Sequence, residues 1–301
     1  MTVLAQTNIN TRTDSCSTQG SHHLTPAQLA AYRDHGFLAP VPALGPELAR
    51  STLSKIEAHE ARHGDFPSKG LKAHLYLPWM NQVVRHPAIL DAAESVLGPD
   101  ILCWSSRFFI KAPGDGGFVS WHQDVTYWGI DVFENILTAW IALSPATREN
   151  GVMKVIPGSH RAIVPHREAA ASNMLLRGQE VSVDVDESQA VYMELKAGEM
   201  SLHHGLMFHG SENNNSNERR VGFAVRYIPT RVKPLDGLPR DSAMLVRGAD
   251  HYGHFDLEPD PVRDMDPVAV ELHRKATATY AEINRLAVQK HDAMIAAQQQ
   301  Q

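Results

Sequence analysis

The segment from Val119 to Asp124, VSWHQD, constrains this chain more than any other feature. β-favouring residues precede His122, and Asp124 follows two positions later. Alternate side chains of an extended strand leave the same face, so the imidazole and the carboxylate are expected to project into one space. Two such groups bind a divalent metal ion only when a third ligand arrives from elsewhere. The segment therefore predicts a strand that presents two of three metal ligands.

His209, in the segment LMFHGS, is the third ligand in our interpretation. Two histidines and one carboxylate on one face of a metal ion suit non-haem Fe(II) and leave coordination positions open. The chain has 17 histidines, most of which must be ordinary surface or core residues. His203 and His204 compete for the role, but their neighbourhood contains no matching acid. We therefore predict that His122, Asp124 and His209 are the metal ligands.

Eleven residues after His209, Arg220 opens the strand-like run Val221–Tyr227. A fixed guanidinium near an iron site is what a dicarboxylate co-substrate needs, because it grips a carboxylate through two parallel hydrogen bonds. The combination of His-x-Asp, His209 and Arg220 therefore supports a metal site much more strongly than a lone His-x-Asp would.

His-x-Asp, a distal histidine and an arginine eleven residues beyond it resemble the phytanoyl-CoA dioxygenase family of Fe(II)/2-oxoglutarate oxygenases. The likeness covers roughly residues 24–235 and includes the phrases LCW, FFIKAPGD, TAW, ENG, VIPGSH and KAGEM. Several phrases are also similar to the carrier-protein halogenases of the same superfamily. Those enzymes have a small residue in place of the metal-binding acid, so that chloride can bind the iron. Because this chain has Asp124, the resemblance implies hydroxylation.

The resemblance also implies a fold and cofactors. The fold would be mainly β with flanking helices, a double-stranded β-helix (a jelly-roll, cupin-like barrel). Many short strands separated by Gly/Pro turns support an all-β core independently. The cofactors would be Fe(II), 2-oxoglutarate and O2. Arg220 would bind the far carboxylate of 2-oxoglutarate, with Ser211 and Thr138 as weaker candidates. Trp140 would pack near the co-substrate, with a purely structural role as the competing interpretation.

Substrate-pocket residues are expected on two segments. Residues 101–111 alternate as a strand that places Arg107, Phe109 and Lys111 on one face, which by the resemblance would line the pocket. Tyr127 and Trp128 would form part of the pocket wall. Basic residues at a barrel rim are as often merely solvated, and the two aromatic residues are otherwise good core residues. Both interpretations therefore stay open.

The predicted activity is 2-oxoglutarate-dependent hydroxylation of an unactivated C–H bond in a small organic molecule, with release of succinate and CO2. Charged and carrier-bound substrates are included in this expectation. The same iron ligands would also serve desaturation, cyclisation or epimerisation. A non-catalytic small-molecule-binding barrel is the alternative from a different class, and the intact triad together with Arg220 argues against it.

The domain organisation predicted from 301 residues and 43% hydrophobic content is one large domain, residues 23–290. Residues 1–22 are polar, without an apolar core, and are expected to be a disordered tail rather than a secretory signal. Residues 161–188 are polar, without a clear period, and are expected to form a lid or loop excursion. A helix is predicted over 266–290, and its apolar stripe would pack on the barrel or form a homodimer contact.

Charge and cysteine content limit the expected partners and location. The net charge is −6 with no basic block, which argues against nucleic acid as a partner. No apolar run approaches the ~20 residues needed to cross a bilayer, so no membrane association is expected. Cys16 lies in the tail and Cys103 in an apparent buried strand, so a disulfide between them is not expected. These features favour a cytoplasmic protein with a small-molecule substrate.

Overall fold

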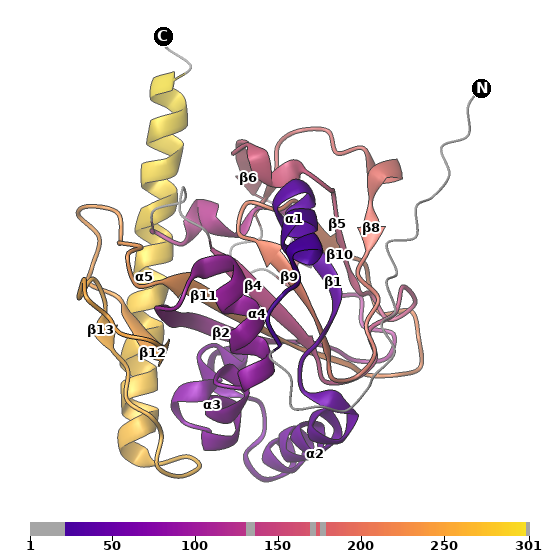
Figure 1. Ribbon diagram of the computed structural model, residues 1–301, viewed down its shortest axis with the longest axis vertical. Helices are drawn as coiled ribbons and strands as arrows, with labels where there is room; N and C mark the ends of the chain where they lie inside the picture. The colour runs from indigo at the N-terminus through magenta and orange to yellow at the C-terminus, as the bar shows by residue number, and fades with distance from the viewer. Residues whose placement is uncertain (1–21, 131–135, 169–172, 175–178, 299–301) are drawn as a thin grey trace.

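The computed structural model describes residues 22–130, 136–168, 173–174 and 179–298. Antiparallel β-sheets form its centre and helices lie on the outside (Figure 1), which confirms the predicted mainly β fold with flanking helices. The predicted tail, residues 1–22, lies outside the described residues except for His22. None of the helices in the described ranges has the length and apolar character needed to cross a membrane.

The large sheet has seven strands in the order β1-β9-β4-β11-β2-β12-β13. Neighbouring strands are antiparallel, except that β12 and β13 run parallel. The strands are β1 Phe37–Pro42, β2 Ile101–Lys111, β4 Leu137–Ala142, β9 Glu199–His204, β11 Arg220–Pro229, β12 Ser242–Arg247 and β13 Asp256–Leu257.

Strand β4 shows why this sheet has one helix-covered face and one cavity-lining face. Leu137, Ala139 and Ile141 belong to the large apolar cluster that the sheet shares with the helices. Thr138 and Trp140, which alternate with them, line a cavity. Successive side chains of a strand point to opposite faces, so one six-residue segment supplies both core and site.

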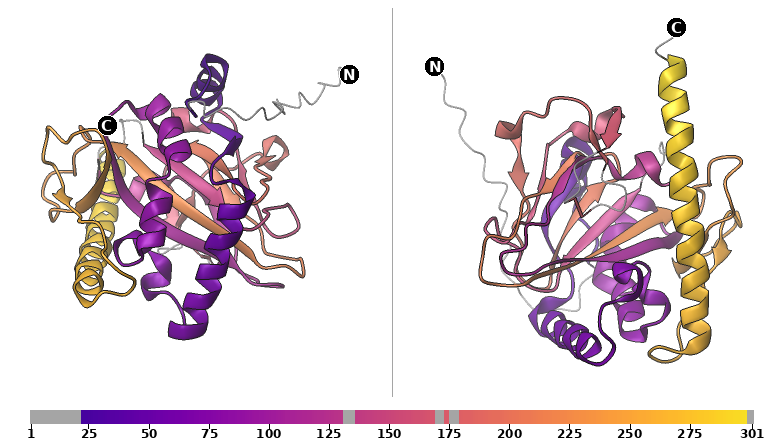
Figure 2. Two further views of the ribbon diagram at one scale, coloured as in Figure 1. Left: turned by 60° about the horizontal axis from the view of Figure 1, so that its bottom comes forward. Right: turned by 180° about the vertical axis from the view of Figure 1, so that it is seen from behind.

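Four helices near the N-terminus cover the apolar face, and Figures 1 and 2 show α2, α3 and α4 packed along one side of the sheet. They are α1 Pro26–His35, α2 Gly45–His63, α3 Pro78–Val84 and α4 Pro87–Leu97. Helix α4 buries most of its residues, including Ile89 and Leu90, in the shared core. The cavity face is therefore left to the second, smaller sheet.

The small sheet closes the barrel in the order β3-β10-β5-β8. Its strands are β3 Val119–His122, β5 Met153–Val155, β8 Val191–Tyr192 and β10 His209–Ser211. All three pairings are antiparallel. This pairing brings residues near position 120 beside residues near position 210.

The segment predicted as a lid, residues 161–188, contains the strands β6 His166–Glu168 and β7 Gln179–Val181, which pair with each other. Part of it lies against the small sheet, where Asn173 Nδ2 donates a hydrogen bond to Ser120 Oγ (2.6 Å). A role as lid stays a prediction.

Helix α5, Pro267–Gln298, runs along the edge of the molecule (Figure 2, right). The backbone N–H of Val268 donates to the Asp266 carboxylate (2.9 Å), so Asp266 satisfies an otherwise free donor of the first turn. Tyr280 packs beside Trp104, with ring centroids 5.2 Å apart. Part of the apolar stripe therefore packs on the barrel, while a homodimer contact stays a prediction.

Candidate metal centre

The two predicted histidine ligands lie on neighbouring strands. His122 ends β3, His209 begins β10, and the two residues are paired directly across the antiparallel register. Their ring centroids are 3.9 Å apart. Side chains opposite each other on one face of a sheet are close by construction, so this pairing alone brings the two imidazoles together.

Asp124 lies beyond the strand that was expected to carry it. β3 ends at His122, and Asp124 begins the short 3-10 helix η3, Asp124–Tyr127. Gln123 between them keeps extended backbone angles (φ −116°, ψ 127°), so the alternation of faces persists to Asp124. The continuous strand was wrong in its end point, yet both side chains still project to the same side.

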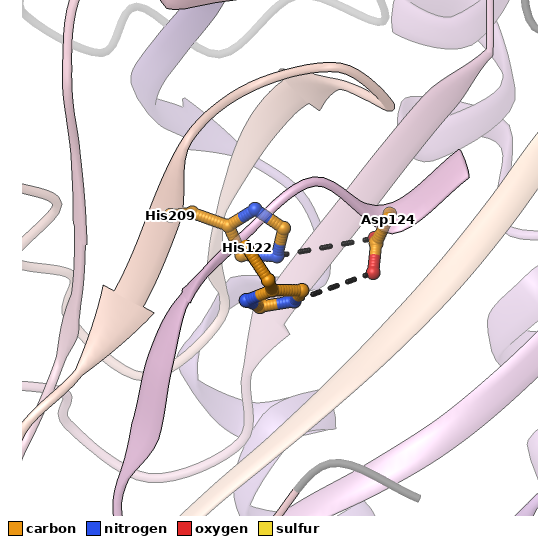
Figure 3. A group of neighbouring side chains, drawn as sticks. All are labelled: His122, Asp124 and His209. Atoms are coloured by element: carbon orange, nitrogen blue, oxygen red, sulfur yellow. Dashed lines mark ion pairs between the residues drawn. The ribbon is translucent and has the colours of Figure 1, made fainter. Parts of the chain in front are cut away.

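The three side chains converge on one point (Figure 3). His122 Nε2 is 3.5 Å from Asp124 Oδ1, and His209 Nε2 is 3.9 Å from Asp124 Oδ2. One potential ligand atom from each residue lies within 4.8 Å of the others. All three residues are buried, at 2%, 2% and 6% exposure. These separations suit three donors arranged around a single ion.

Backbone carbonyls fix the orientation of both imidazoles. His122 Nδ1–H donates to Ser120 O (2.9 Å), and His209 Nδ1–H donates to Met207 O (2.9 Å). A carbonyl oxygen only accepts, so each ring carries its proton on Nδ1 and presents the Nε2 lone pair to the centre. Such second contacts hold a metal-binding histidine in its tautomer and orientation.

Asp124 is held ionised by its neighbours. Burial alone raises the pKa of this carboxyl, but Arg226, whose Nε lies 3.7 Å from Asp124 Oδ2, and the two histidines lower the pKa well below its ordinary value. Burial, followed by the proximity of His122, lowers the pKa of His209 well below 6.5. An ionised carboxylate and a neutral imidazole are the forms of these side chains that bind a metal ion.

A cavity lined by residues of both sheets surrounds this centre. It contains the predicted ligands, the four predicted 2-oxoglutarate residues and one predicted substrate residue. Its lining is Phe109, Val119, His122, Asp124, Thr138, Trp140, Met153, His203, His209, Gly210, Ser211, Arg220, Ala224 and Arg226.

Arg220 is a buried cation without a counterion among the described residues. Its side chain is 2% exposed, one terminal nitrogen donates to the Gly151 carbonyl, and its Nε has no hydrogen-bond partner. The guanidinium lies over the Trp140 ring at 5.4 Å. Burial lowers the pKa of Arg220 to about 10, so it remains charged at neutral pH. A buried charge of this kind is costly unless an anion accompanies it.

Three other predicted pocket residues, Arg107, Lys111 and Trp128, lie outside the cavity lining. Arg107 donates to Met174 O (3.3 Å), and Lys111 donates to Ser211 Oγ (2.9 Å) from the strand beside Arg220. Trp128 packs in the core against Trp104. The side chain of Tyr127 falls outside the described part of the structure.

Among the cavity-lining residues that the sequence interpretation did not assign to the site, two have ionisable side chains, Arg226 and His203. Arg226 lies on the same face of β11 as Arg220, a relation that the two-residue period of the strand could have indicated. His203, set aside as a competing ligand, has its ring centroid 4.8 Å from that of His209. Burial is the main cause that lowers the pKa of His203, to about 4.

A β-barrel whose interior holds two histidines, one carboxylate and a nearby buried arginine defines the class of non-haem Fe(II)- and 2-oxoglutarate-dependent oxygenases. The model of the family "Phytanoyl-CoA dioxygenase (PhyH)" matches residues 32–222. The chain therefore belongs to the phytanoyl-CoA dioxygenase family.

Similar proteins agree with this assignment. A solved non-heme monooxygenase, ThoJ in its apo form, is 36% identical with a TM-score of 0.77, covering 87% of this chain and 99% of that one. A probable alpha-ketoglutarate-dependent hypophosphite dioxygenase of Stutzerimonas stutzeri is 29% identical over 54% of this chain and 58% of its own length. Human peroxisomal phytanoyl-CoA dioxygenase is 28% identical over 50% and 46%. The chain thus spans about half the length of the curated relatives it matches.

Proposed function

We propose that this protein is an Fe(II)- and 2-oxoglutarate-dependent dioxygenase that hydroxylates an unactivated C–H bond of a small organic substrate and releases succinate and CO2. The observation that carries the proposal is the convergence of His122, Asp124 and His209 on one point of a cavity that also contains the uncompensated Arg220. One cavity thus contains three candidate ligands for a metal ion and a buried cation that suits a dicarboxylate.

The metal would be held by two neutral Nε2 atoms and one carboxylate. Fe(II) bound in this way with 2-oxoglutarate supplies the oxidising power for C–H oxidation from O2. The residues of the chain supply orientation and exclude water. The Ser120 and Met207 carbonyls fix the imidazoles, and Arg226 keeps Asp124 ionised. Fixing such groups in advance removes reorganisation from the reaction.

Arg220 would bind the far carboxylate of 2-oxoglutarate, with Ser211 and Trp140 beside it. Lys111 holds the Ser211 hydroxyl at 2.9 Å. Because Lys111 Nζ–H donates, Ser211 Oγ accepts this bond and its own hydrogen remains available for a ligand in the cavity. The buried cation and this oriented hydroxyl support a carboxylate subsite. Thr138 lies near the start of β4, beside Arg226 in the register.

Hydroxylation is preferred to halide chemistry because Asp124 occupies the coordination position that an anion would need. Desaturation, cyclisation and epimerisation use the same ligands and are alternatives within this class. The names of relatives, one a hypophosphite dioxygenase and one a phytanoyl-CoA dioxygenase, support the oxygenase chemistry. Since those two substrates differ chemically, neither is transferred to this chain.

Anaerobic titration of the purified chain with Fe(II) and then 2-oxoglutarate tests the proposal. A weak visible charge-transfer band is expected, and admission of O2 should release succinate. Ala substitutions of His122 or His209 should abolish the band. His204→Ala is the control, because His204 is a nearby histidine that does not line the cavity. A wild-type protein that gives no band would identify a binding barrel instead, and loss of the band in His204→Ala alone would overturn the ligand assignment.

A further inference from the structure

Two polar side chains lie side by side on the cavity wall. His203 on β9 and Thr138 on β4 are directly opposite in the antiparallel register, and both line the cavity. They are 1% exposed. Their three polar side-chain atoms, both ring nitrogens of His203 and Oγ1 of Thr138, have no hydrogen-bond partner within the described residues. Buried polar atoms are nearly always paired, so this concentration of unpaired atoms requires an explanation.

Other polar groups around the cavity already have partners within the protein. His209 donates from Nδ1 to Met207 O, and Ser211 accepts from Lys111. Arg220 has a free nitrogen, but this belongs to the charged end proposed to bind a carboxylate. The His203–Thr138 pair is therefore a distinct part of the wall, and its polar atoms have no hydrogen-bond partner within the described residues.

The pair lies at the level of the metal centre and away from the start of β11, where Arg220 is. His203 packs beside His209 at 4.8 Å, and Thr138 is paired with Arg226, which faces Asp124 at 3.7 Å. Arg220 begins the strand six residues before Arg226, and its guanidinium lies over Trp140, two positions farther along β4 than Thr138. A group bound by the pair would therefore lie next to the metal rather than at the carboxylate subsite.

We propose that His203 and Thr138 bind an uncharged polar group of the primary substrate, such as an amide or a hydroxyl, and so orient the carbon to be oxidised. The proposal rests on the oxygenase function above. A hydroxyl and an imidazole each donate and accept, which matches a ligand group that does both. His203 forms no ion pair in the described part of the chain, and the charge of Arg226 is opposed by Asp124. The pair is therefore matched to a neutral partner.

The first experiment uses the metal-free full chain and needs no substrate. Thr138→Val and His203→Phe replace unpaired polar atoms by apolar groups of similar shape, so the melting temperature should equal or exceed that of the wild type. Ser106→Ala is the control, because its buried hydroxyl is paired with His74 Nδ1 at 2.7 Å. The control should melt at a lower temperature. An equal decrease in Thr138→Val would show a structural role and overturn the proposal.

The second experiment assigns the ligand. Anaerobic titration of Fe(II)-loaded Thr138→Val and His203→Phe with 2-oxoglutarate should give apparent dissociation constants within about twofold of wild type. A weakening of tenfold or more would assign the pair to the co-substrate and overturn the proposal. Absence of the charge-transfer band in the wild type would instead contradict the oxygenase function, while the melting comparison would still decide whether the pair is structural.

The third experiment tests the chemistry of the substrate. Compounds in matched pairs, differing by a single amide or hydroxyl, are compared for their stimulation of succinate release by the wild type. For the polar compound of such a pair, the stimulation of succinate release should be at least tenfold lower in Thr138→Val than in the wild type. Thr138→Ser, which keeps a hydroxyl, should retain most of the stimulation. Equal stimulation of wild type and Thr138→Val by that compound would contradict the proposal.

Discussion

At the scale of single residues, the buried charges of Asp124, Arg226 and Arg220 determine what the site can bind. Asp124 is opposed by Arg226, whereas Arg220 has no counterion in the described residues. The charges of Asp124 and Arg226 therefore offset each other, whereas the charge of Arg220 is not offset. This difference explains why a carboxylate-bearing co-substrate is expected beside Arg220 rather than beside Arg226.

Replacing Arg220 with Ala should weaken 2-oxoglutarate binding far more than Fe(II) binding. Loss of a charge-assisted contact to a buried carboxylate costs ~2–5 kcal/mol, which corresponds to a rise in apparent dissociation constant of roughly thirtyfold or more. Titration of the charge-transfer band measures this change. Arg219→Ala is the matched control, because Arg219 points outward and pairs with Glu60 at 2.6 and 2.9 Å. A comparable loss in the control would contradict the assignment.

Replacing Asp124 with Gly should convert the carboxylate position into an anion site. The substitution opens a coordination position and removes the carboxylate that lies 3.7 Å from Arg226 Nε, and both changes favour an anion. The variant is expected to retain some Fe(II) and 2-oxoglutarate binding and to change its charge-transfer spectrum when titrated with chloride or azide. If the variant binds iron and 2-oxoglutarate but shows no anion-dependent change, Asp124 does not occupy a halide-accessible position.

At the scale of elements, β11 and β4 depend on each other through a glycine. Gly222 pairs with Ala142, and a Cβ added to it would lie 1.9 Å from the Trp140 ring. The Trp140 indole therefore occupies the space that a side chain at position 222 would need. Trp140 in turn lies beneath the Arg220 guanidinium, so the backbone of β11 limits the position of the indole in the proposed co-substrate subsite.

Gly222→Ala should displace Trp140 and damage the subsite. Overpacking of this kind typically destabilises a protein by about 1–3 kcal/mol, and the affinity for 2-oxoglutarate should fall together with stability. Gly116→Ala is a control, since an added Cβ there meets nothing within 4 Å. Denaturant unfolding and 2-oxoglutarate titration measure the two effects. Unchanged affinity in Gly222→Ala would show that Trp140 is structural only.

At the scale of the whole molecule, a buried ion cluster links distant parts of the chain. Lys72 Nζ lies 2.6 Å from Glu258 Oε1, and His74 Nε2 lies 3.5 Å from Glu258 Oε2. Lys72 also donates to the Ser242 carbonyl at 2.7 Å. The cluster joins the segment before α3 to the edge strands β12 and β13. Removing one partner would leave an uncompensated buried charge.

Glu258 should make folding stability depend on acid pH. Burial raises the pKa of Glu258, but the opposing effect of Lys72 and His74 is larger and lowers it from an ordinary 4.5 to about 2. A lowered folded-state pKa contributes stability that is present above about 4.5 and is lost as pH falls towards 2. Glu258→Gln should therefore be less stable than wild type at pH 7, by a margin that shrinks below pH 4.5.

Urea unfolding from pH 3 to pH 7 measures this margin. Glu282→Gln is the control, because Glu282 is half-exposed and pairs with Arg285 on the surface of α5. Its difference from wild type should be small at every pH. A margin for Glu258→Gln that stayed constant down to pH 3 would show that the carboxylate charge does not stabilise the fold.

Local periodicity made much of this protein predictable from its sequence. The two-residue alternation of strands placed Thr138 with Trp140, and kept His122 and Asp124 on one side although the strand ends between them. The mainly β fold and family membership also followed, because the motifs combine in a fixed order and spacing. Alternation is a property of the covalent chain in extended form and needs no knowledge of tertiary contacts.

Contacts between distant strands were decided only by the tertiary structure. The pairing of β9 with β4 placed His203 opposite Thr138, and the pairing of β4 with β11 placed Thr138 beside Arg226. The same packing directed Trp128 into the core. Strand order and register depend on how the whole apolar face is buried against the helices, since a shift of one residue would exchange core and cavity faces. The alternation thus determined which residues share a face, and packing determined what each of them meets there.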